Sequence, residues 1–229
     1  MSVSMLYGSV PLAMESAKPE LPFDPARWSA LDIVRNQTSE RVILVPQSHA
    51  QRAQTEAFIR DVYAQAFGAG GLEFPNTLVA LLGGDDRPLC AAGLRTASDG
   101  FFSEAYLEAP IQEVLSARLE KPVVRESIFE VNTLASRRVE VSPSFLRHLT
   151  ELGKRAGFEW CFFTAGSRLR KLLRHLSIPI VELSPADPQR LPSPERWGSY
   201  YSDAPQVCAV EGRWLDGGAV RQDDVPPHA

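Results

Sequence analysis

The stretch from Ser127 to Arg138, SIFEVNTLASRR, places an acid and an amide inside an apolar run that is typical of a β-strand. Because strand side chains alternate between two faces, Glu130 and Asn132 should share one face with Ile128 and Leu134. Burial beside apolar groups raises the pKa of a carboxylic acid towards the range in which it can act as a general base. We therefore predict that Glu130 is a general base or an amine-binding group and that Asn132 orients a substrate. The alternative is that both are hydrogen-bonded polar groups of the core.

Basic side chains follow this strand. Arg137 and Arg138 stand just before a predicted helix, whose free N–H groups and positive dipole end suit an anion. Residues 137–174 carry nine basic and three acidic side chains, a balance of +6, although the whole chain has a net charge of −4. This asymmetry favours an anion site in the middle of the fold. The alternative is that these are solvated charges on loop and helix surfaces.

The chain of 229 residues, with 44% hydrophobic side chains, has the composition of one globular domain. It holds no apolar run of the roughly 18 residues that could span a bilayer, and its N-terminus has no early Lys or Arg to begin a secretory signal. Three widely spaced cysteines and four histidines lack metal-ligand spacing. We expect a cytoplasmic protein with no structural metal, no integral membrane segment and no nucleic-acid partner.

Hydrophobic periodicity predicts an α/β (α+β) domain with a mixed central sheet flanked by helices. We expect an N-terminal arm at 1–38, the domain at 39–214 and a disordered tail at 215–229. The predicted elements are a strand at 41–47, a helix at 48–69 capped by Ser48, a hairpin at 76–97, helical segments broken at Pro110, a strand at 127–134, a helix at 144–156 capped by Ser142 or Ser144, a strand at 158–165, a helix at 167–178 capped by Ser167, and strands at 179–183 and 205–212. The strand–helix–strand crossovers predict parallel pairing in the second half, and the hairpin predicts antiparallel pairing in the first.

This element order resembles that of the GNAT acyltransferase superfamily. In that fold the fourth strand splays from the fifth, acyl-pantetheine lies in the gap, and its phosphates lie against the helix that follows the fourth strand. Here the corresponding strands would be 127–134 and 158–165. The resemblance implies that an amine attacks a thioester between them.

More closely, the chain resembles the thermostable hemolysin family. The matching stretches are SEAYLEAPIQEVLSARL, IFEVNTLAS, GFEWCFFTAGSRLRKLLRHLSIPIVELSPADPQRL and WGSYYSDAPQVCA. EVNTLAS is also similar to the corresponding strand of acyl-homoserine-lactone synthases, which share the GNAT fold. The resemblance implies an N-acyltransferase that moves a fatty acyl group from coenzyme A or acyl-carrier protein to a small amino-acid-like amine, with no tightly bound cofactor.

The resemblance also implies roles for individual residues. Glu130, Tyr200 and Tyr201 would be catalytic, with a tyrosine hydroxyl protonating the leaving thiolate. The donor site would comprise Leu134, Ala135, Ser136, Arg137, Arg138 and Arg168. The acceptor site would comprise Arg95, which could hold a carboxylate, with Asn132, Phe163, Thr164 and Trp197. The structural alternatives are that Arg95 forms a surface salt bridge and that Trp197, Tyr200 and Tyr201 close the edge of the core.

One motif departs from the GNAT pattern. Residues 136–143, SRRVEVSP, contain no glycine where a Gly-rich loop would cradle a pyrophosphate. This favours acyl-carrier protein, held through the basic helix at 168–174, over coenzyme A. It also leaves open a non-catalytic acyl-carrier or lipid-binding module. A membrane-active hemolysin, which the family name suggests, is the third interpretation, although the sequence contains no pore-forming pattern.

Overall fold

The computed structural model describes residues 40–137 and 142–212. The predicted arm at 1–38, the predicted tail at 215–229 and Arg138 lie outside these residues.

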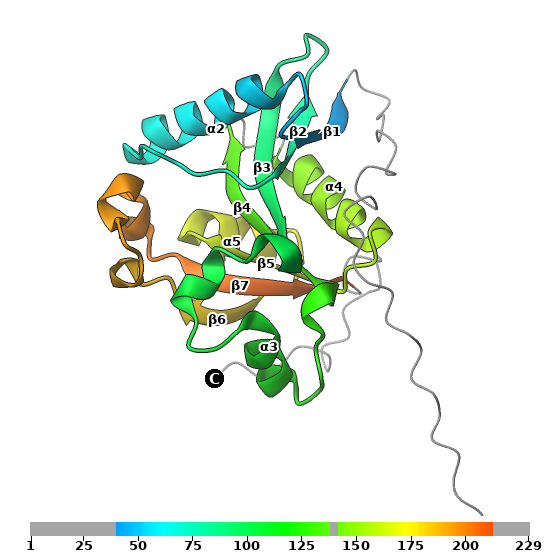
Figure 1. The fold of residues 1–229 in the computed structure, drawn as a ribbon, viewed down its shortest axis with the longest axis vertical. Helices are drawn as coiled ribbons and strands as arrows, with labels where there is room; N and C mark the ends of the chain where they lie inside the picture. Colours follow the sequence, from blue (N-terminus) through cyan, green and yellow to red (C-terminus); the bar gives the residue numbers. More distant parts are fainter. Residues whose placement is uncertain (1–39, 138–141, 213–229) are drawn as a thin grey trace, which may run out of the picture.

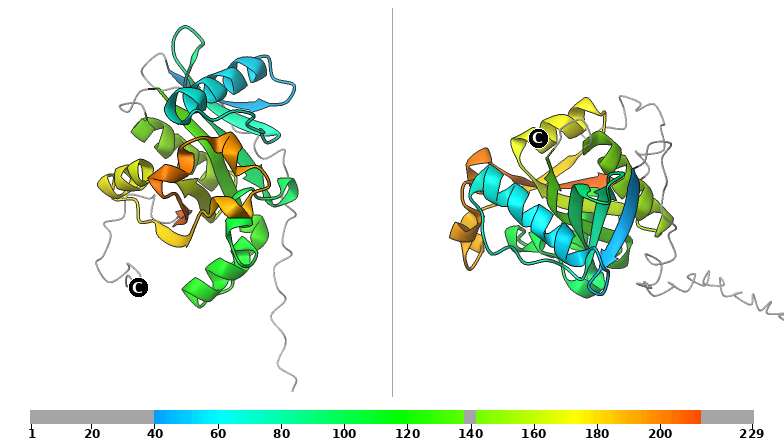
Figure 2. Two further views of the ribbon diagram at one scale, coloured as in Figure 1. Left: turned by 90° about the vertical axis from the view of Figure 1, so that its left-hand side faces the viewer. Right: turned by 90° about the horizontal axis from the view of Figure 1, so that it is seen from above.

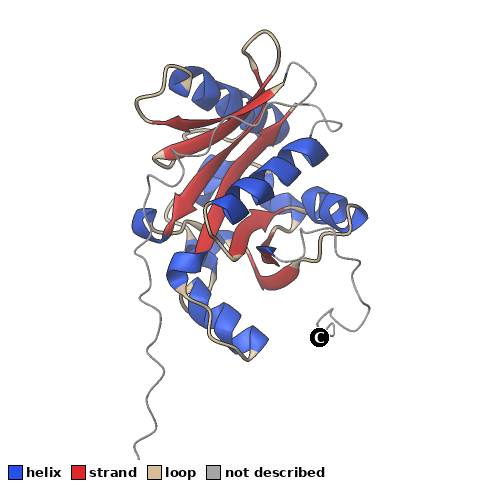
Figure 3. Cartoon of the chain, turned by 90° about the vertical axis from the view of Figure 1, so that its right-hand side faces the viewer, coloured by secondary structure: helices blue, strands red, loops and turns tan. Residues whose placement is uncertain are grey.

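One seven-stranded sheet runs through the described part of the chain, in the order β1-β2-β3-β4-β5-β7-β6. Figure 3 shows it as a twisted sheet with helices on both faces. The prediction of a mixed sheet flanked by helices is confirmed. The strands are β1 Arg41–Pro46, β2 Thr77–Leu82, β3 Pro88–Thr96, β4 Ile128–Ser136, β5 Trp160–Ala165, β6 Val181–Pro185 and β7 Gln206–Glu211.

The helices cover the two faces of this sheet in pairs (Figures 1 and 2). They are α2 Arg52–Phe67, α3 Ile111–Leu119, α4 Ser142–Arg155 and α5 Ser167–His175. Helices α2 and α3 bury their apolar side chains in two clusters on one face, and α4 and α5 pack into one cluster on the other. The 3₁₀ turns that matter for the site are η2 Ser103–Tyr106, η5 Pro194–Trp197 and η6 Tyr200–Asp203.

Two predicted helix caps are wrong. Helix α2 begins at Arg52 rather than at 48, and its N-cap is Gln51, not Ser48. The Arg52 guanidinium fixes this end by donating to the carbonyls of Val45, Pro75 and Asn76. Helix α5 has Gly166 as its N-cap, because the hydroxyl of Ser167 donates instead to Asp203 at 2.5 Å.

Strands β4 and β5 separate after a short parallel contact. They pair only from Ile128 to Glu130. Beyond that point β4 continues beside β3, whereas β5 continues beside β7, so a gap opens in the sheet. This parallel pair agrees with the sequence prediction, but β7 inserts between β5 and β6, so both of those strands have antiparallel neighbours.

A β-bulge at Thr133 reverses the two faces of β4. Thr133 has φ +44°, and the β3–β4 register skips at this position. Before the bulge, Phe129 and Val131 face α4 and α5; after it, Leu134 packs on that same side. The prediction that Leu134 shares a face with Glu130 is therefore wrong, because an extra residue shifts the alternation by one.

Candidate functional site

Two cavities lie on opposite sides of the β4–β5 gap. The larger, of about 540 Å³, lies on the side of α4 and α5. Its lining is mainly apolar and includes Val131, Leu134, Leu146, Leu149, Phe163, Leu169, Leu173 and Ile178. Arg168 is the basic side chain in its wall.

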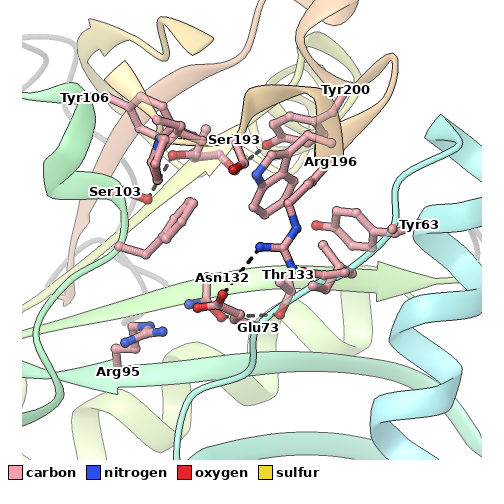
Figure 4. A pocket seen from close by; sticks show the side chains of 18 residues that line it. Tyr63, Glu73, Arg95, Ser103, Tyr106, Asn132, Thr133, Ser193, Arg196 and Tyr200 are labelled. Carbon is pink, nitrogen blue, oxygen red and sulfur yellow. Dashed lines mark hydrogen bonds and ion pairs between the residues drawn. The ribbon is translucent and has the colours of Figure 1, made fainter. Parts of the chain in front are cut away.

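The smaller cavity, of about 160 Å³, is polar at its base and aromatic at its walls (Figure 4). Arg95 and Asn132 project from β3 and β4, and Tyr63 projects from α2. The segment 70–73 after α2 contributes Glu73, and the segments around η2 and η5 contribute Phe102, Ser103, Tyr106, Ser193, Arg196 and Trp197.

Five residues line both cavities: Tyr63, Asn132, Thr133, Thr164 and Tyr200. Three of them come from β4 and β5, where these strands diverge. The two cavities therefore meet at the gap in the sheet, and we call these five residues the junction. A molecule in one cavity could react there with a molecule in the other.

The backbone at the junction is strained. A β-branched residue with positive φ is a genuine outlier, and such a conformation costs about 1–3 kcal/mol. In the β3–β4 register, Ala135 pairs with Ala91 and Asn132 pairs with Gly93, so Thr133 and Leu134 both lie opposite the single residue Ala92.

Glu130 is fully buried and lines neither cavity. Its carboxylate accepts hydrogen bonds from the N–H groups of Phe102 (2.7 Å) and Ser103 (2.9 Å) and from the Ser103 hydroxyl (2.7 Å). Burial raises the pKa of Glu130, although these hydrogen bonds and the charge of Arg95 oppose the rise. The carboxylate is thus a satisfied core group, as one interpretation of the sequence held. Ser103 and Thr164 connect it to the junction, because their hydroxyl oxygens are 2.9 Å apart.

Arg95 is weakly held. Its Nη1 atom is 3.4 Å from the carbonyl oxygens of both Asp99 and Gly100, and its buried Nε atom has no hydrogen-bond partner among the described residues. A guanidinium with donors to spare at the base of a cavity can bind a carboxylate. Arg95 therefore lines the smaller cavity and does not form the surface salt bridge that was the alternative interpretation.

The predicted aromatic residues divide between the site and its support. The Tyr200 hydroxyl donates to the Thr164 carbonyl oxygen at 3.3 Å, and burial raises the pKa of Tyr200 well above its ordinary value, so it keeps its proton. Trp197 lines the smaller cavity. Tyr201 lines neither cavity, and its hydroxyl is 2.6 Å from that of Tyr106.

The predicted donor-site residues are not all brought together. Leu134 and Arg168 line the larger cavity. Ala135 is buried beneath α2, and Ser136 accepts a hydrogen bond from the Cys90 thiol. Arg137 is 3.2 Å from Asp61 in an exposed ion pair.

The basic face of α5 is partly used within the fold. Arg170 donates to the carbonyls of Ala165 and Ala204, and both Arg170 and Arg174 pair with Glu182. Arg168 and Lys171 are exposed, and neither has a partner among the described residues. The part of α5 that remains free to bind an anion is therefore smaller than the sequence suggested.

Several site residues were missed in the sequence. They are Tyr63, Ser103, Tyr106 and Arg196. Ser103 begins the SEAYLEAPIQEVLSARL stretch, so the resemblance could have drawn attention to it. Tyr63 and Arg196 carry no local signal, because only the fold brings α2 and η5 to the same cavity.

Neither a metal cluster nor a membrane span is found in the described ranges. No three His, Cys, Asp or Glu side chains among residues 40–137 and 142–212 are placed to hold a metal ion. No helix in these ranges is long and apolar enough to cross a bilayer. The three cysteines are buried and unpaired, as expected for small core residues.

Solved structures with the same fold include acyl-homoserine lactone synthases. The AHL synthase LasI is 8% identical with a TM-score of 0.52, over 80% of this chain and 98% of LasI. The CoA-dependent synthase BjaI, solved with SAM and isopentyl-CoA, is 11% identical with a TM-score of 0.51, over 76% of this chain and 85% of BjaI. At these identities the likeness concerns the fold, and it agrees with the expected GNAT-like architecture.

Comparison with curated protein sequences finds no match. The family model described as thermostable hemolysin matches residues 45–214, which include every strand from β2 to β7 and all five junction residues. Because this match covers more than half of the sequence, the chain belongs to the thermostable hemolysin family.

Proposed function

We propose that this protein is an N-acyltransferase that moves a fatty acyl group from a pantetheine thioester to the amine of a small amino-acid-like acceptor. The observation that carries the proposal is the pair of cavities that meet at the β4–β5 gap. The thioester occupies the larger cavity, with its carbonyl carbon at the junction, and the amine approaches from the smaller one.

The size and lining of the larger cavity support a fatty acyl chain over an acetyl group. An engineered apolar cavity of about 150 Å³ binds benzene. The larger cavity here has about 540 Å³, more than three times that volume, and ten Leu, Val, Ile and Phe side chains line its walls. Burial of a long chain against these walls gives about 0.8 kcal/mol for each CH₂ group.

Acyl-carrier protein is the donor that the charges favour. Arg168 lines the larger cavity and Lys171 lies one turn further along α5, and both are exposed. Two exposed basic groups suit the phosphodiester and the acidic surface of a carrier protein. Residues 136–143 lack the glycines that would cradle a pyrophosphate. Carrier-protein donors imply that the reaction takes place in the cytoplasm.

The acceptor carries a carboxylate that binds Arg95. The long Nη1 contacts of Arg95 leave its guanidinium free to bind a carboxylate in the smaller cavity. Asn132 orients the acceptor, and Trp197 packs on it. The amine then reaches the junction beside Thr164.

The reaction is a direct transfer. The amine nitrogen attacks the thioester carbonyl, the N–C bond forms, and the bulge N–H groups of Thr133 and Leu134 stabilise the oxyanion. The C–S bond then breaks, and the neutral Tyr200 hydroxyl can protonate the leaving thiolate. The amine gives up one proton in return, so the products are an N-acyl amino acid and a free thiol.

Turnover tests this proposal. Purified protein is incubated with palmitoyl-carrier protein or palmitoyl-CoA and a pool of amino acids, and products are identified by mass spectrometry. We expect an N-palmitoyl amino acid and faster turnover with the carrier protein. Donor binding without any acylated product would contradict the enzyme and select a non-catalytic lipid-binding module.

The family name supports a second role, the lysis of membranes. An N-acyl amino acid has one long chain and one carboxylate, so it is an anionic amphiphile that enters bilayers. We attribute lysis to this product. The same reaction mixtures, added to dye-loaded phosphatidylcholine vesicles, should release dye only when donor and acceptor are both present. Release by the protein alone would instead identify a membrane-active hemolysin.

A further inference from the structure

We infer that the hydroxyls of Ser103 and Thr164 form a relay that carries the amine proton from the junction to Glu130. This inference rests on the proposed function and adds to it the route by which a buried base acts. The sequence predicted that Glu130 is a general base or an amine-binding group. The fold closes the direct route, because Glu130 is fully buried and lines neither cavity.

The relay is continuous in distance. The Ser103 hydroxyl is 2.7 Å from Oε1 of Glu130, and the Thr164 hydroxyl is 2.9 Å from that of Ser103. Ser103 is 1% exposed and lines the smaller cavity only, whereas Thr164 is half-buried and lines both cavities. The chain of oxygens therefore runs from the closed core to the point where the two cavities meet.

The number of hydrogens sets the direction of each bond. A hydroxyl has one hydrogen and two lone pairs. An ionised Glu130 can only accept hydrogen bonds. Ser103 therefore donates its hydrogen to the carboxylate and must accept a hydrogen bond from the Thr164 hydroxyl. The Thr164 oxygen then keeps a lone pair for an N–H group in the smaller cavity. An amine positioned by Arg95 and Asn132 is the group that this lone pair suits.

The surroundings of Glu130 allow it to gain and lose a proton. The charged or titratable groups that face it are Arg95 on β3, Tyr106 on η2 and Cys161 on β5. Two backbone N–H groups hold the carboxylate in place whether or not Ser103 keeps its hydroxyl. Glu130 can therefore remain positioned when the relay is cut.

The proton movement balances as follows. As the N–C bond forms, one N–H proton passes to Thr164, the Thr164 proton passes to Ser103, and the Ser103 proton passes to Glu130. The reverse sequence returns this proton to the junction after the thiolate has left and taken the proton of Tyr200, which restores Tyr200. No oxidant, reductant or metal is required.

Four variants test the relay: Thr164→Val, Thr164→Ser, Ser103→Ala and Glu130→Gln. We expect Thr164→Val and Ser103→Ala to lower the kcat/KM for the amine by about 10²-fold or more, the usual effect of general base catalysis. Thr164→Ser should retain most of the activity, because it keeps the hydroxyl. Donor binding, measured by calorimetry with palmitoyl-CoA, should be unchanged in Ser103→Ala and Glu130→Gln, because neither residue lines the larger cavity.

The pH profile separates the relay from a merely structural role. Wild-type kcat/KM should rise with pH as Glu130 ionises, and this limb should disappear in Ser103→Ala and Glu130→Gln alike. A Thr164→Val variant with wild-type kcat/KM and the same limb would overturn the relay while leaving the acyltransferase intact. Absence of turnover in the wild-type protein would overturn the proposed function, and the relay with it.

Discussion

Asn132 holds its place at the junction because Gly93, opposite it on β3, has no side chain. A Cβ atom at Gly93 would overlap the Asn132 side-chain oxygen and stand 2.8 Å from Pro75 Cγ. Asn132 also accepts a hydrogen bond of 3.3 Å from the Thr133 hydroxyl. One glycine thus keeps the amide and the strained bulge in position together.

We therefore expect Gly93→Ala to lose most of its acyl-transfer activity while remaining folded. Overpacking of this kind costs about 1–3 kcal/mol of stability. Gly153→Ala is the matched control, because its Cβ would stand 2.5 Å from the Phe129 ring, away from both cavities. Steady-state kinetics and thermal unfolding of the two variants separate the effects. Equal activity in both folded variants would refute a role for Gly93 in the site.

At the residue scale, the sequence indicated which side chains could react better than it indicated where those side chains lie. An acid and an amide in an apolar strand drew attention to Glu130 and Asn132. The alternation of strand side chains could not predict the face on which Leu134 lies, because no local sequence pattern indicates the bulge at Thr133. The hydrogen bonds that occupy Glu130 come from residues 102 and 103, and a contact between residues 27 or 28 positions apart has no local pattern.

The turn η2, which presents the Ser103 N–H and hydroxyl to Glu130, is braced by an ion pair at the element scale. Glu104 accepts from Arg125 at 2.5 and 2.9 Å and from the N–H of Ile111 at the start of α3 at 2.9 Å. The Arg125 guanidinium lies 4.6 Å from the centre of the Phe101 ring. This network ties η2, α3 and the entry to β4 into one unit.

Removal of the Glu104 charge should lower stability in a pH-dependent way. Burial acts to raise the pKa of Glu104, but the bonds from Arg125 and Ile111 outweigh it and lower the pKa. Its stabilisation is thus fully present above the unfolded pKa of about 4.3 and is lost as pH falls through the lower folded value. Urea unfolding should show Glu104→Gln to be about 1.5–3 kcal/mol less stable at pH 7.

The difference between wild type and Glu104→Gln should shrink as the pH is lowered below about 4. Glu113→Gln, an exposed carboxylate in the first turn of α3, serves as the control and should change stability little. A Glu104→Gln deficit that stayed constant from pH 7 to pH 3 would argue against the ion pair as its cause.

The sequence predicted which strands exist. It did not predict where the helices begin or which strands lie side by side. Apolar runs and Gly or Pro breaks gave every described strand. The start of α2 depends on distant carbonyls that bind Arg52, and the Ser167 hydroxyl binds Asp203, so local capping rules misplaced the N-caps of both α2 and α5. The insertion of β7 between β5 and β6 is likewise determined by tertiary packing and not by a local sequence pattern.

At the scale of the whole molecule, the described residues are organised around a sheet in which β4 and β5 diverge. Strands β4 and β5 share three register pairs and then diverge, and each finds another partner. The resemblance to GNAT proteins predicted this gap, but composition and periodicity did not. The gap lets an apolar cavity on one face meet a polar cavity on the other, which is the arrangement that a transfer reaction requires.

The most direct test of this arrangement is the acyl-chain-length profile of a variant that fills the larger cavity. Leu149 is buried on α4 and lines that cavity. Leu149→Trp should move the preferred donor from long to short acyl chains, with short-chain turnover retained, whereas the volume-conserving Leu149→Met should keep the wild-type profile. A parallel fall in turnover for every chain length in Leu149→Trp, with the variant folded, would contradict the placement of the acyl chain between β4 and β5.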